Sequence, residues 1–257
     1  MPSRPGSRAG RRRRNLLARG LWGSAEIVVT FGVVVLLLVV HQLWWTNREA
    51  RQDAGRTVQA LQREWGPPPS PVVPSGEPTG ESVVPQPPPS SGATRRLEPS
   101  GAPATPRWDH AYAVLRIPRI GLTVPVAEGT SKGGVLDRGY VGHYTRTAQA
   151  GQAGNFALAG HRNTHGEPFR RLDRLRRGDR VTVETRDAVY TYTVDKSLAR
   201  TAPSDSGVIA PVPRSNITTS VGYSEPGYYL TLTTCTPEFS SRYRLVIWGK
   251  LTAMRSR

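Results

Sequence analysis

An uncharged apolar segment near the N-terminus constrains the fold of this chain more than any other feature. Residues 27–45 read IVVTFGVVVLLLVVHQLWW and contain no charged side chain. As a helix this segment would be about 28 Å long, close to the roughly 30 Å hydrocarbon core of a bilayer. Trp44 and Trp45 end the segment, and their rings favour the membrane interface. We therefore expect a membrane-spanning helix over residues 26–46.

The charge on either side of this segment predicts its orientation. Residues 1–25 contain seven arginines and no acidic residue, in a chain with 35 Lys and Arg against 19 Asp and Glu. Because basic flanks stay inside, we expect a cytoplasmic tail, a single pass through the cell membrane and an extracytoplasmic remainder. A cleaved signal peptide would have a shorter apolar core and a small-residue cleavage site, which HQLWW does not offer. The arginines then contact anionic headgroups, and no nucleic-acid partner is expected.

A stretch rich in Pro, Ser and Gly follows the apolar segment. We assign residues 47–107 to an extracytoplasmic linker, in which the polar residues 48–65 can continue the membrane helix. Residues 66–106 include GPPPSPVVPS and VVPQPPPSSG. Such sequence buries too little apolar surface to fold and favours extended polyproline II. At about 3.1 Å per residue it could hold a domain roughly 120 Å from the bilayer.

Residues 108–257 have the pattern of a β domain. Short runs of β-branched and aromatic residues alternate with polar ones, and Gly, Pro or Asp end the runs. Seven or eight short strands predict a sandwich or a barrel. Residues 169–177 give the best helical turn, with Phe169, Leu172 and Leu175 on one face. The expected strands are 112–117, 122–126, 155–159, 180–185, 188–194, 228–233 and 243–251.

The single cysteine is the strongest candidate for chemistry. Cys235 ends the apolar run YYLTLTTC. Because the chain has one cysteine, no intramolecular disulfide is possible. A free cysteine is often a small buried hydrophobe, but an unpaired thiol at a strand end in an oxidising compartment favours a nucleophile. A thiol nucleophile needs a base or a cationic neighbour. His161, which follows the apolar run NFALAG, is the best candidate, and a solvated loop histidine is the alternative.

A fixed cation would stabilise the negative charge that forms when a thiolate attacks a carbonyl. Arg242 and Arg244 precede LVIW on the strand expected to pair with the cysteine strand, and both would point to one face. Ordinary surface arginines are the alternative for both. The long irregular stretch 199–227 lies just before the cysteine strand. Loops of this length are usually functional, so we expect it to face a substrate.

These segments resemble the sortase family over residues 110–251. LTTC followed by an Arg before an aliphatic strand is similar to the TLxTC…R signature of sortases, and GNFALAGHRNTHGEPFRRLDRLRRGD resembles their histidine segment. The order of basic tail, anchor, Pro-rich linker and β domain is also similar to that of sortases. The string VGHYTRTAQAGQAGNFALAGHR and the Arg-rich composition are most similar to class E, the housekeeping-type sortases of high-GC Gram-positive bacteria.

The resemblance implies a closed eight-stranded β-barrel with short helices, and it implies roles for particular residues. Cys235 matches the nucleophile and His161 the catalytic histidine of the family. Arg244 matches the arginine because it directly precedes LVIW, with Arg242 as the competitor. Thr234 matches the threonine that lines the substrate groove in sortases.

His143 and His165 fall outside the catalytic position of the family. Some sortases bind calcium through an acidic loop, but Asp173 and Asp179 stand among arginines here, so we expect no metal and no cofactor.

The resemblance also implies an activity. The enzyme would cleave an LPXTG-like sorting signal, LAXTG in class E, between Thr and Gly through a thioester. It would then pass the acyl group to an amine of a cell-wall precursor. The expected partners are proteins with a C-terminal sorting signal, the wall amine and the membrane. The non-enzymatic alternative is a membrane-tethered β module that binds wall polymers through its basic charge.

Overall fold

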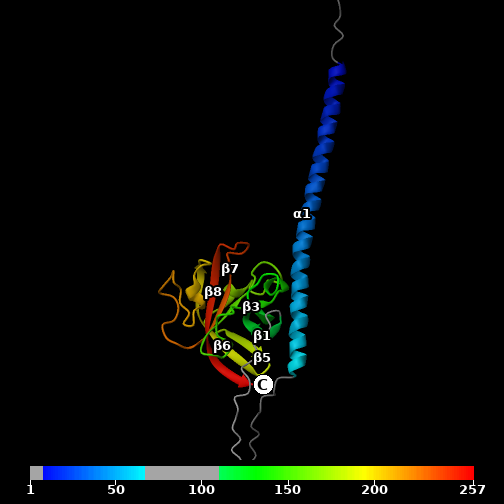
Figure 1. Ribbon diagram of the computed structural model, residues 1–257. Helices are drawn as coiled ribbons and strands as arrows, with labels where there is room; N and C mark the ends of the chain where they lie inside the picture. Colours follow the sequence, from blue (N-terminus) through cyan, green and yellow to red (C-terminus); the bar gives the residue numbers. More distant parts are fainter. Residues whose placement is uncertain (1–7, 67–109) are drawn as a thin grey trace, which may run out of the picture.

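A closed eight-stranded barrel forms the C-terminal part of the chain in the computed structural model, which describes residues 8–66 and 110–257 (Figure 1). The strand order around the barrel is β1-β2-β3-β4-β7-β8-β6-β5. Neighbouring strands are antiparallel except for the β2–β3 and β4–β7 pairs. The strands are β1 (Ala111–Ile117), β2 (Leu122–Glu128), β3 (Val141–His143), β4 (Gly154–Ala159), β5 (Arg180–Thr185), β6 (Ala188–Thr201), β7 (Tyr228–Thr236) and β8 (Tyr243–Ser256).

The alternation of side chains along each strand separates the inside of the barrel from its outer face. Leu230 and Leu232 of β7 and Ile247 of β8 belong to the interior cluster. Their neighbours Tyr229 and Trp248 belong to a second buried cluster on the outer face. The period-two pattern of the sequence thus produces an apolar barrel interior and a second, partly covered face.

Residues 202–227 cover part of this outer face, and they contain the short 3-10 helix η4 (Ser206–Ile209). The carbonyl oxygen of Val208 accepts hydrogen bonds from the hydroxyl of Thr231 at 3.2 Å and from the indole of Trp248 at 3.0 Å. The amide of Asn155 donates to the carbonyl oxygen of Ala210 at 3.0 Å. The long irregular stretch is therefore fixed onto β4, β7 and β8.

The barrel confirms the predicted all-β fold, with three local differences. The short strand β3 escaped prediction because three residues with a central glycine carry no strand pattern. β6 and β8 are longer than expected, since both continue into polar sequence where they pair with each other. The expected helical turn contains only the 3-10 helix η3 (Leu172–Arg174), although Phe169 and Leu172 are fully buried.

One long helix, α1 (Arg8–Trp65), precedes the barrel. Within the residues that the structure describes, it is the helix long and apolar enough to cross a membrane. Residues 47–65, which the sequence analysis placed in the linker, continue this helix without a break. The remainder of that linker, residues 67–107, lies outside the described residues.

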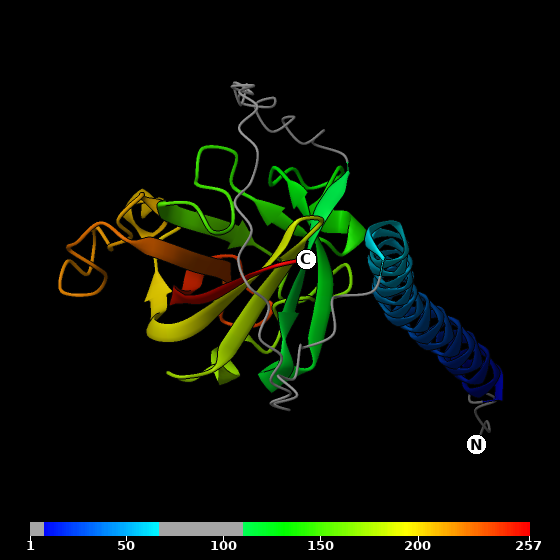
Figure 2. The same cartoon turned by 90° about the horizontal axis from the view of Figure 1, so that it is seen from below.

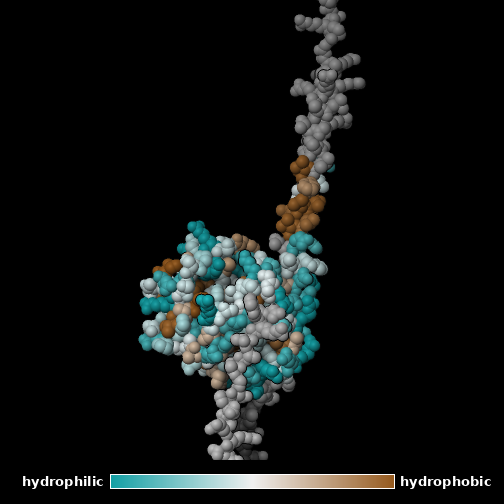
Figure 3. Space-filling view, in the orientation of Figure 1, coloured by the Kyte–Doolittle hydropathy of each residue, from teal (hydrophilic) through white to brown (hydrophobic). Residues whose placement is uncertain are grey.

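The C-terminal half of α1 packs along one side of the barrel (Figures 1 and 2). Ala54 of the helix forms a small buried cluster with Ala127, Val135 and Tyr140 of the barrel. The apolar segment 27–45 projects beyond the barrel and exposes its Val and Leu side chains (Figure 3). The helix is therefore apolar and free over this segment, whereas its polar residues 47–65 are docked on the barrel.

Candidate active site

Cys235 and Arg244 lie directly opposite each other on neighbouring strands. In the antiparallel β7–β8 pair, Cys235 is the register partner of Arg244. Residues opposite each other in such a pair point to the same side of the sheet, with Cβ atoms about 5 Å apart. Both side chains are half-buried. The Arg244 Nη1 group donates to the carbonyl oxygens of Ser241 at 2.9 Å and Tyr243 at 3.0 Å, which holds the guanidinium over the β7–β8 connection.

The sheet brings His161 to the other side of Cys235. β4 and β7 are parallel, with Ala159 in register with Thr233. The alignment continues past the strand end, because the Gly160 amide donates to the Thr233 carbonyl oxygen at 3.2 Å. His161 is the next residue, so its backbone leaves β4 beside the end of the cysteine strand, where Arg162 reaches the Cys235 carbonyl oxygen. Because the barrel order is β4-β7-β8, the three predicted catalytic residues come from adjacent strand ends on one rim.

The cysteine side chain belongs to the outer face of the barrel. It has the same strand parity as Thr233 and Tyr229, whereas Leu232 and Thr234 have the opposite parity and face inward. Thr234 is 3% exposed and donates to the Gly160 carbonyl oxygen at 2.8 Å. Its predicted place in a substrate groove differs from this inward position, in which it ties the cysteine strand to the segment that carries His161.

An aspartate that the sequence analysis missed contacts the candidate histidine. Asp137 lies on the 3-10 helix η2 (Leu136–Arg138), and its Oδ1 accepts a hydrogen bond from His161 Nε2 at 2.9 Å. The bond engages one ring nitrogen of His161 and fixes the orientation of the ring. No local pattern signals this contact, because Asp137 precedes the histidine by 24 residues.

Comparisons with known proteins agree with this arrangement. A sortase domain model matches residues 115–252. Sortase SrtE2 of Streptomyces coelicolor is 30% identical over 254 residues, covering 96% of this chain and 87% of that protein. This chain belongs to the sortase family.

Several of the similar sortases carry the letter E in their names. Sortase SrtE1 of Streptomyces coelicolor is 41% identical over 237 residues, covering 90% of this chain and 57% of SrtE1, so the chain spans little more than half of that relative. The crystal structure of Sortase E1 from the same organism, with a tripeptide in the active site, has a TM-score of 0.55 and 47% identity. That match covers 60% of this chain and 94% of the crystallised chain. The class E resemblance expected from the sequence is thereby confirmed.

A buried arginine of this sortase donates hydrogen bonds to the end of the cysteine strand. Arg162 is 7% exposed, and its Nη1 donates to the Cys235 carbonyl oxygen at 3.3 Å and to the Thr236 hydroxyl at 3.0 Å. Its Nη2 lies 3.5 Å from a carboxylate oxygen of Asp173. Because Arg162 directly follows His161, this dipeptide contacts both Asp137 and the backbone of Cys235. The string GHR contains the arginine, but its position after the histidine does not reveal this contact.

The sequence also left Arg242 as a rival to Arg244. Arg242 precedes β8, is exposed, and lies over the ring of Tyr243 at 5.3 Å from the ring centroid. It therefore lies outside the strand ladder that aligns Arg244 with Cys235.

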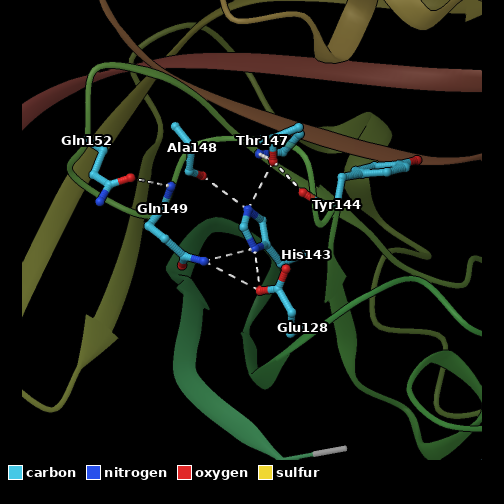
Figure 4. A network of polar contacts seen from close by, with 8 residues as sticks. Glu128, His143, Tyr144, Thr147, Ala148, Gln149 and Gln152 are labelled. Atoms are coloured by element: carbon cyan, nitrogen blue, oxygen red, sulfur yellow. Dashed lines mark hydrogen bonds and ion pairs between the residues drawn. The ribbon is translucent and has the colours of Figure 1, made fainter. Parts of the chain in front are cut away.

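His143 lies in a separate buried network (Figure 4). Its Nδ1 lies 2.8 Å from a carboxylate oxygen of Glu128, and its Nε2 lies 3.1 Å from the Ala148 carbonyl oxygen and 3.0 Å from the Thr147 hydroxyl. The ring is fully buried. Both ring nitrogens are thus engaged in joining β2 and β3 to the loop after β3.

His165 lies beside the candidate histidine. Its ring centroid is 5.3 Å from that of His161, and its Nδ1 is 3.5 Å from Asp137 Oδ1. The potential ligand atoms of these three side chains lie within 4.8 Å of one another. A hydrogen bond joins Asp137 to His161, and the contact between the two imidazole rings places His165 beside them.

Proposed function

We propose that this sortase is a membrane-anchored cysteine transpeptidase. Cys235 is the nucleophile, His161 the acid and base, and Arg244 the cation at the carbonyl oxygen. The main support is the strand order β4-β7-β8 together with its register, which aligns the ends that carry these residues. A wall-binding module would not require a thiol, an imidazole and a guanidinium at one place.

The first half of the reaction forms a thioester. The Cys235 thiolate attacks the carbonyl carbon of the Thr residue in the sorting signal. Arg244 and backbone amides stabilise the oxyanion, which is worth most in a partly desolvated site. The imidazolium of His161 donates its proton to the departing Gly amine, because an amine is a poor leaving group without one.

The second half transfers the acyl group. An amine of a cell-wall precursor attacks the thioester, and neutral His161 accepts the proton of that amine. The thiolate leaves and is ready for the next substrate. Asp137 binds Nε2 of His161 in both halves of the reaction, so that Nδ1 exchanges the proton.

The substrate is a protein with an LPXTG-like signal, LAXTG in the preferred form, that is cleaved between Thr and Gly. The single apolar helix anchors the enzyme in the cell membrane, with the basic N-terminus in the cytoplasm and the barrel outside. Enzyme and membrane-anchored substrate then share one surface.

The test uses purified full-length protein, an LAXTG peptide and a diamino-acid acceptor. Wild type is expected to release the Gly-containing fragment and form the transfer product, and intact mass should show the acyl group on Cys235. Cys235→Ala and His161→Ala should both lose cleavage. Cleavage at the wild-type rate by either variant overturns the mechanism, and wall binding by a wild type that cleaves no peptide supports the non-enzymatic module.

A peptide panel that varies the second and third positions of the signal defines the substrate class. An LAXTG preference over LPXTG is expected as a higher kcat/KM. The reverse preference would remove the class E assignment of substrate while leaving the transpeptidase mechanism intact.

A further inference from the structure

The polar half of α1 contacts the loop that follows His161. Arg51 Nε donates to the Gly166 carbonyl oxygen at 3.1 Å, and Arg51 Nη2 donates to Glu167 Oε2 at 2.8 Å. Asn47 Nδ2 donates to Glu167 Oε1 at 3.0 Å, and Asn47 Oδ1 accepts from the Gly166 amide at 3.2 Å. One turn of the helix therefore forms four hydrogen bonds with two consecutive loop residues.

This loop has a backbone conformation that needs support. His165, Gly166 and Glu167 all have positive φ angles, of 50°, 82° and 54°. Left-handed backbone is unfavourable for residues with a Cβ, and it persists only where surrounding contacts fix it. At the base of the loop, the amide of Phe169 donates to the His161 carbonyl oxygen at 3.0 Å. The contacts from α1 are thus the external support of a strained turn that begins at the candidate histidine.

The same helix holds the element that carries Asp137. Asp53 Oδ2 accepts hydrogen bonds from Tyr140 at 3.2 Å and from Arg138 Nε at 3.4 Å. The hydroxyl of Thr57 lies 2.7 Å from that of Tyr140. Asp137 directly precedes Arg138, so α1 contacts the short element on which Asp137 lies.

Close packing at Gly139 adds to these hydrogen bonds. Gly139 has a φ of 77°, and a Cβ there would lie 2.8 Å from the Ala50 carbonyl oxygen. The backbone of the barrel therefore approaches the helix as closely as a glycine allows.

We propose that residues 47–57 of α1 are part of the active site, with Asn47, Arg51 and Asp53 as positioning residues for His161. The helix holds the loop on one side of this histidine and the aspartate on the other. Displacement of the imidazole by about 1 Å can cost around a hundredfold in rate, so loss of these contacts should lower kcat. Because it concerns His161, this role rests on the proposed function.

The test compares two double variants of the full-length protein in lipid nanodiscs. Asn47→Ala with Arg51→Ala removes the contacts to the loop, and Gln59→Ala with Arg63→Ala is the matched control at exposed positions of the same helix. The first should lower kcat by about tenfold and change KM for the LAXTG peptide less than twofold, since the contacts lie on the histidine side. The control should retain the wild-type kcat and KM.

Conservative rescue separates positioning from general destabilisation. Arg51→Lys keeps a cation near Glu167 but replaces the planar guanidinium, whose Nε and Nη2 serve two acceptors, with a compact ammonium. In the Asn47 wild-type background it should recover most of the kcat that Arg51→Ala loses. Equal losses for Lys and Ala, or a loss that appears in KM rather than kcat, would overturn the positioning role.

Hydrogen exchange tests the same proposal without any activity. Amides of residues 161–169 should exchange at least tenfold faster in the Asn47→Ala, Arg51→Ala variant than in wild type, while β7 and β8 remain unchanged. Wild-type exchange in this loop overturns the inference even if the enzyme is active. Faster exchange in a protein that cleaves no peptide would instead retain the helix–loop coupling and reject the proposed function.

Discussion

The two sides of the catalytic rim are held in different ways. Cys235 and Arg244 are partners in a strand ladder that continues into the barrel core. His161 lies beyond the end of β4, where Asp137 contacts its ring and the polar part of α1 contacts the loop that follows it. The cysteine side is therefore a consequence of the fold, whereas the histidine side depends on contacts that a change at the surface can remove.

The largest expected effect is on the ladder side. Arg244→Ala should lower kcat/KM by about a hundredfold to a thousandfold, because the oxyanion loses its main side-chain donor. Arg242→Ala is the matched control, since that side chain is exposed and precedes β8. Peptide cleavage kinetics provide the measurement. Equal losses of kcat/KM in the two variants would show that alignment with Cys235 does not decide which arginine stabilises the oxyanion.

On the histidine side, Asp137→Ala should have a smaller effect. The ring loses the acceptor of its Nε2 proton, and losses of about tenfold to a hundredfold are usual for such supporting carboxylates. The loss should appear in kcat, with the peptide KM retained. Asp187→Ala is the control aspartate, because it is exposed in the turn between β5 and β6. A wild-type kcat for Asp137→Ala would show that the ring is oriented by other contacts.

The hydrogen bond between Thr234 and Gly160, which joins the cysteine strand to the histidine segment, should contribute to the free energy of unfolding. Thr234→Val removes the buried hydroxyl that donates to Gly160, with little change in shape. A buried acceptor left without its donor costs about 1–3 kcal/mol, so the free energy of unfolding in urea should fall by that amount. Thr252→Val, at an exposed position of β8, is the control. An unchanged free energy of unfolding would mean that Gly160 finds another donor.

The smallest expected effect concerns docking of α1 at high pH. Burial, with Asp53 nearby, raises the pKa of Tyr140 above its usual value of 10.0. The stabilisation by the neutral phenol is therefore complete below pH 10 and is lost as the pH rises through the folded pKa. The free energy of unfolding, compared between wild type and Tyr140→Phe from pH 8 to 11, should favour wild type by about 1 kcal/mol at pH 8.

That advantage should shrink as the pH increases beyond 10. The comparison with Tyr140→Phe is needed because burial also raises the pKa of Tyr192, to about 12. A difference between the two proteins that grows with pH would contradict the sign of the shift at Tyr140.

Sequence patterns predicted the strands on the side of the site that the sheet determines. Alternation predicted β7 and β8, and the register then places Arg244, rather than Arg242, opposite Cys235. The catalytic role of Arg244 stays a prediction. The short β3 and the inward direction of Thr234 were missed, because neither has a signal beyond the sheet in which it lies.

The histidine side could not be predicted in the same way. Asp137, Arg51 and Asn47 are separated from the loop after His161 by long stretches of sequence, and polar side chains on a membrane-proximal helix have the composition of an ordinary solvated surface. The docking of α1 on the barrel reveals the contacts of Asn47 and Arg51, and the folding of η2 against the end of β4 reveals that of Asp137. Non-local polar pairs of this kind have no period that sequence reading can detect.

The helix α1 ends beside the far end of the barrel. Gly66 lies at the end of the helix, where its carbonyl oxygen accepts a hydrogen bond from Arg257 at 2.7 Å, next to the C-terminus (Figure 1). The catalytic loop contacts Asn47 and Arg51, which follow Trp45 by about 3 and 9 Å of helical rise. Under the membrane anchoring proposed above, this helix sets the height of the Cys235 thiol above the bilayer. A sorting signal anchored in the same membrane would then meet the thiol only a few residues from its own hydrophobic segment.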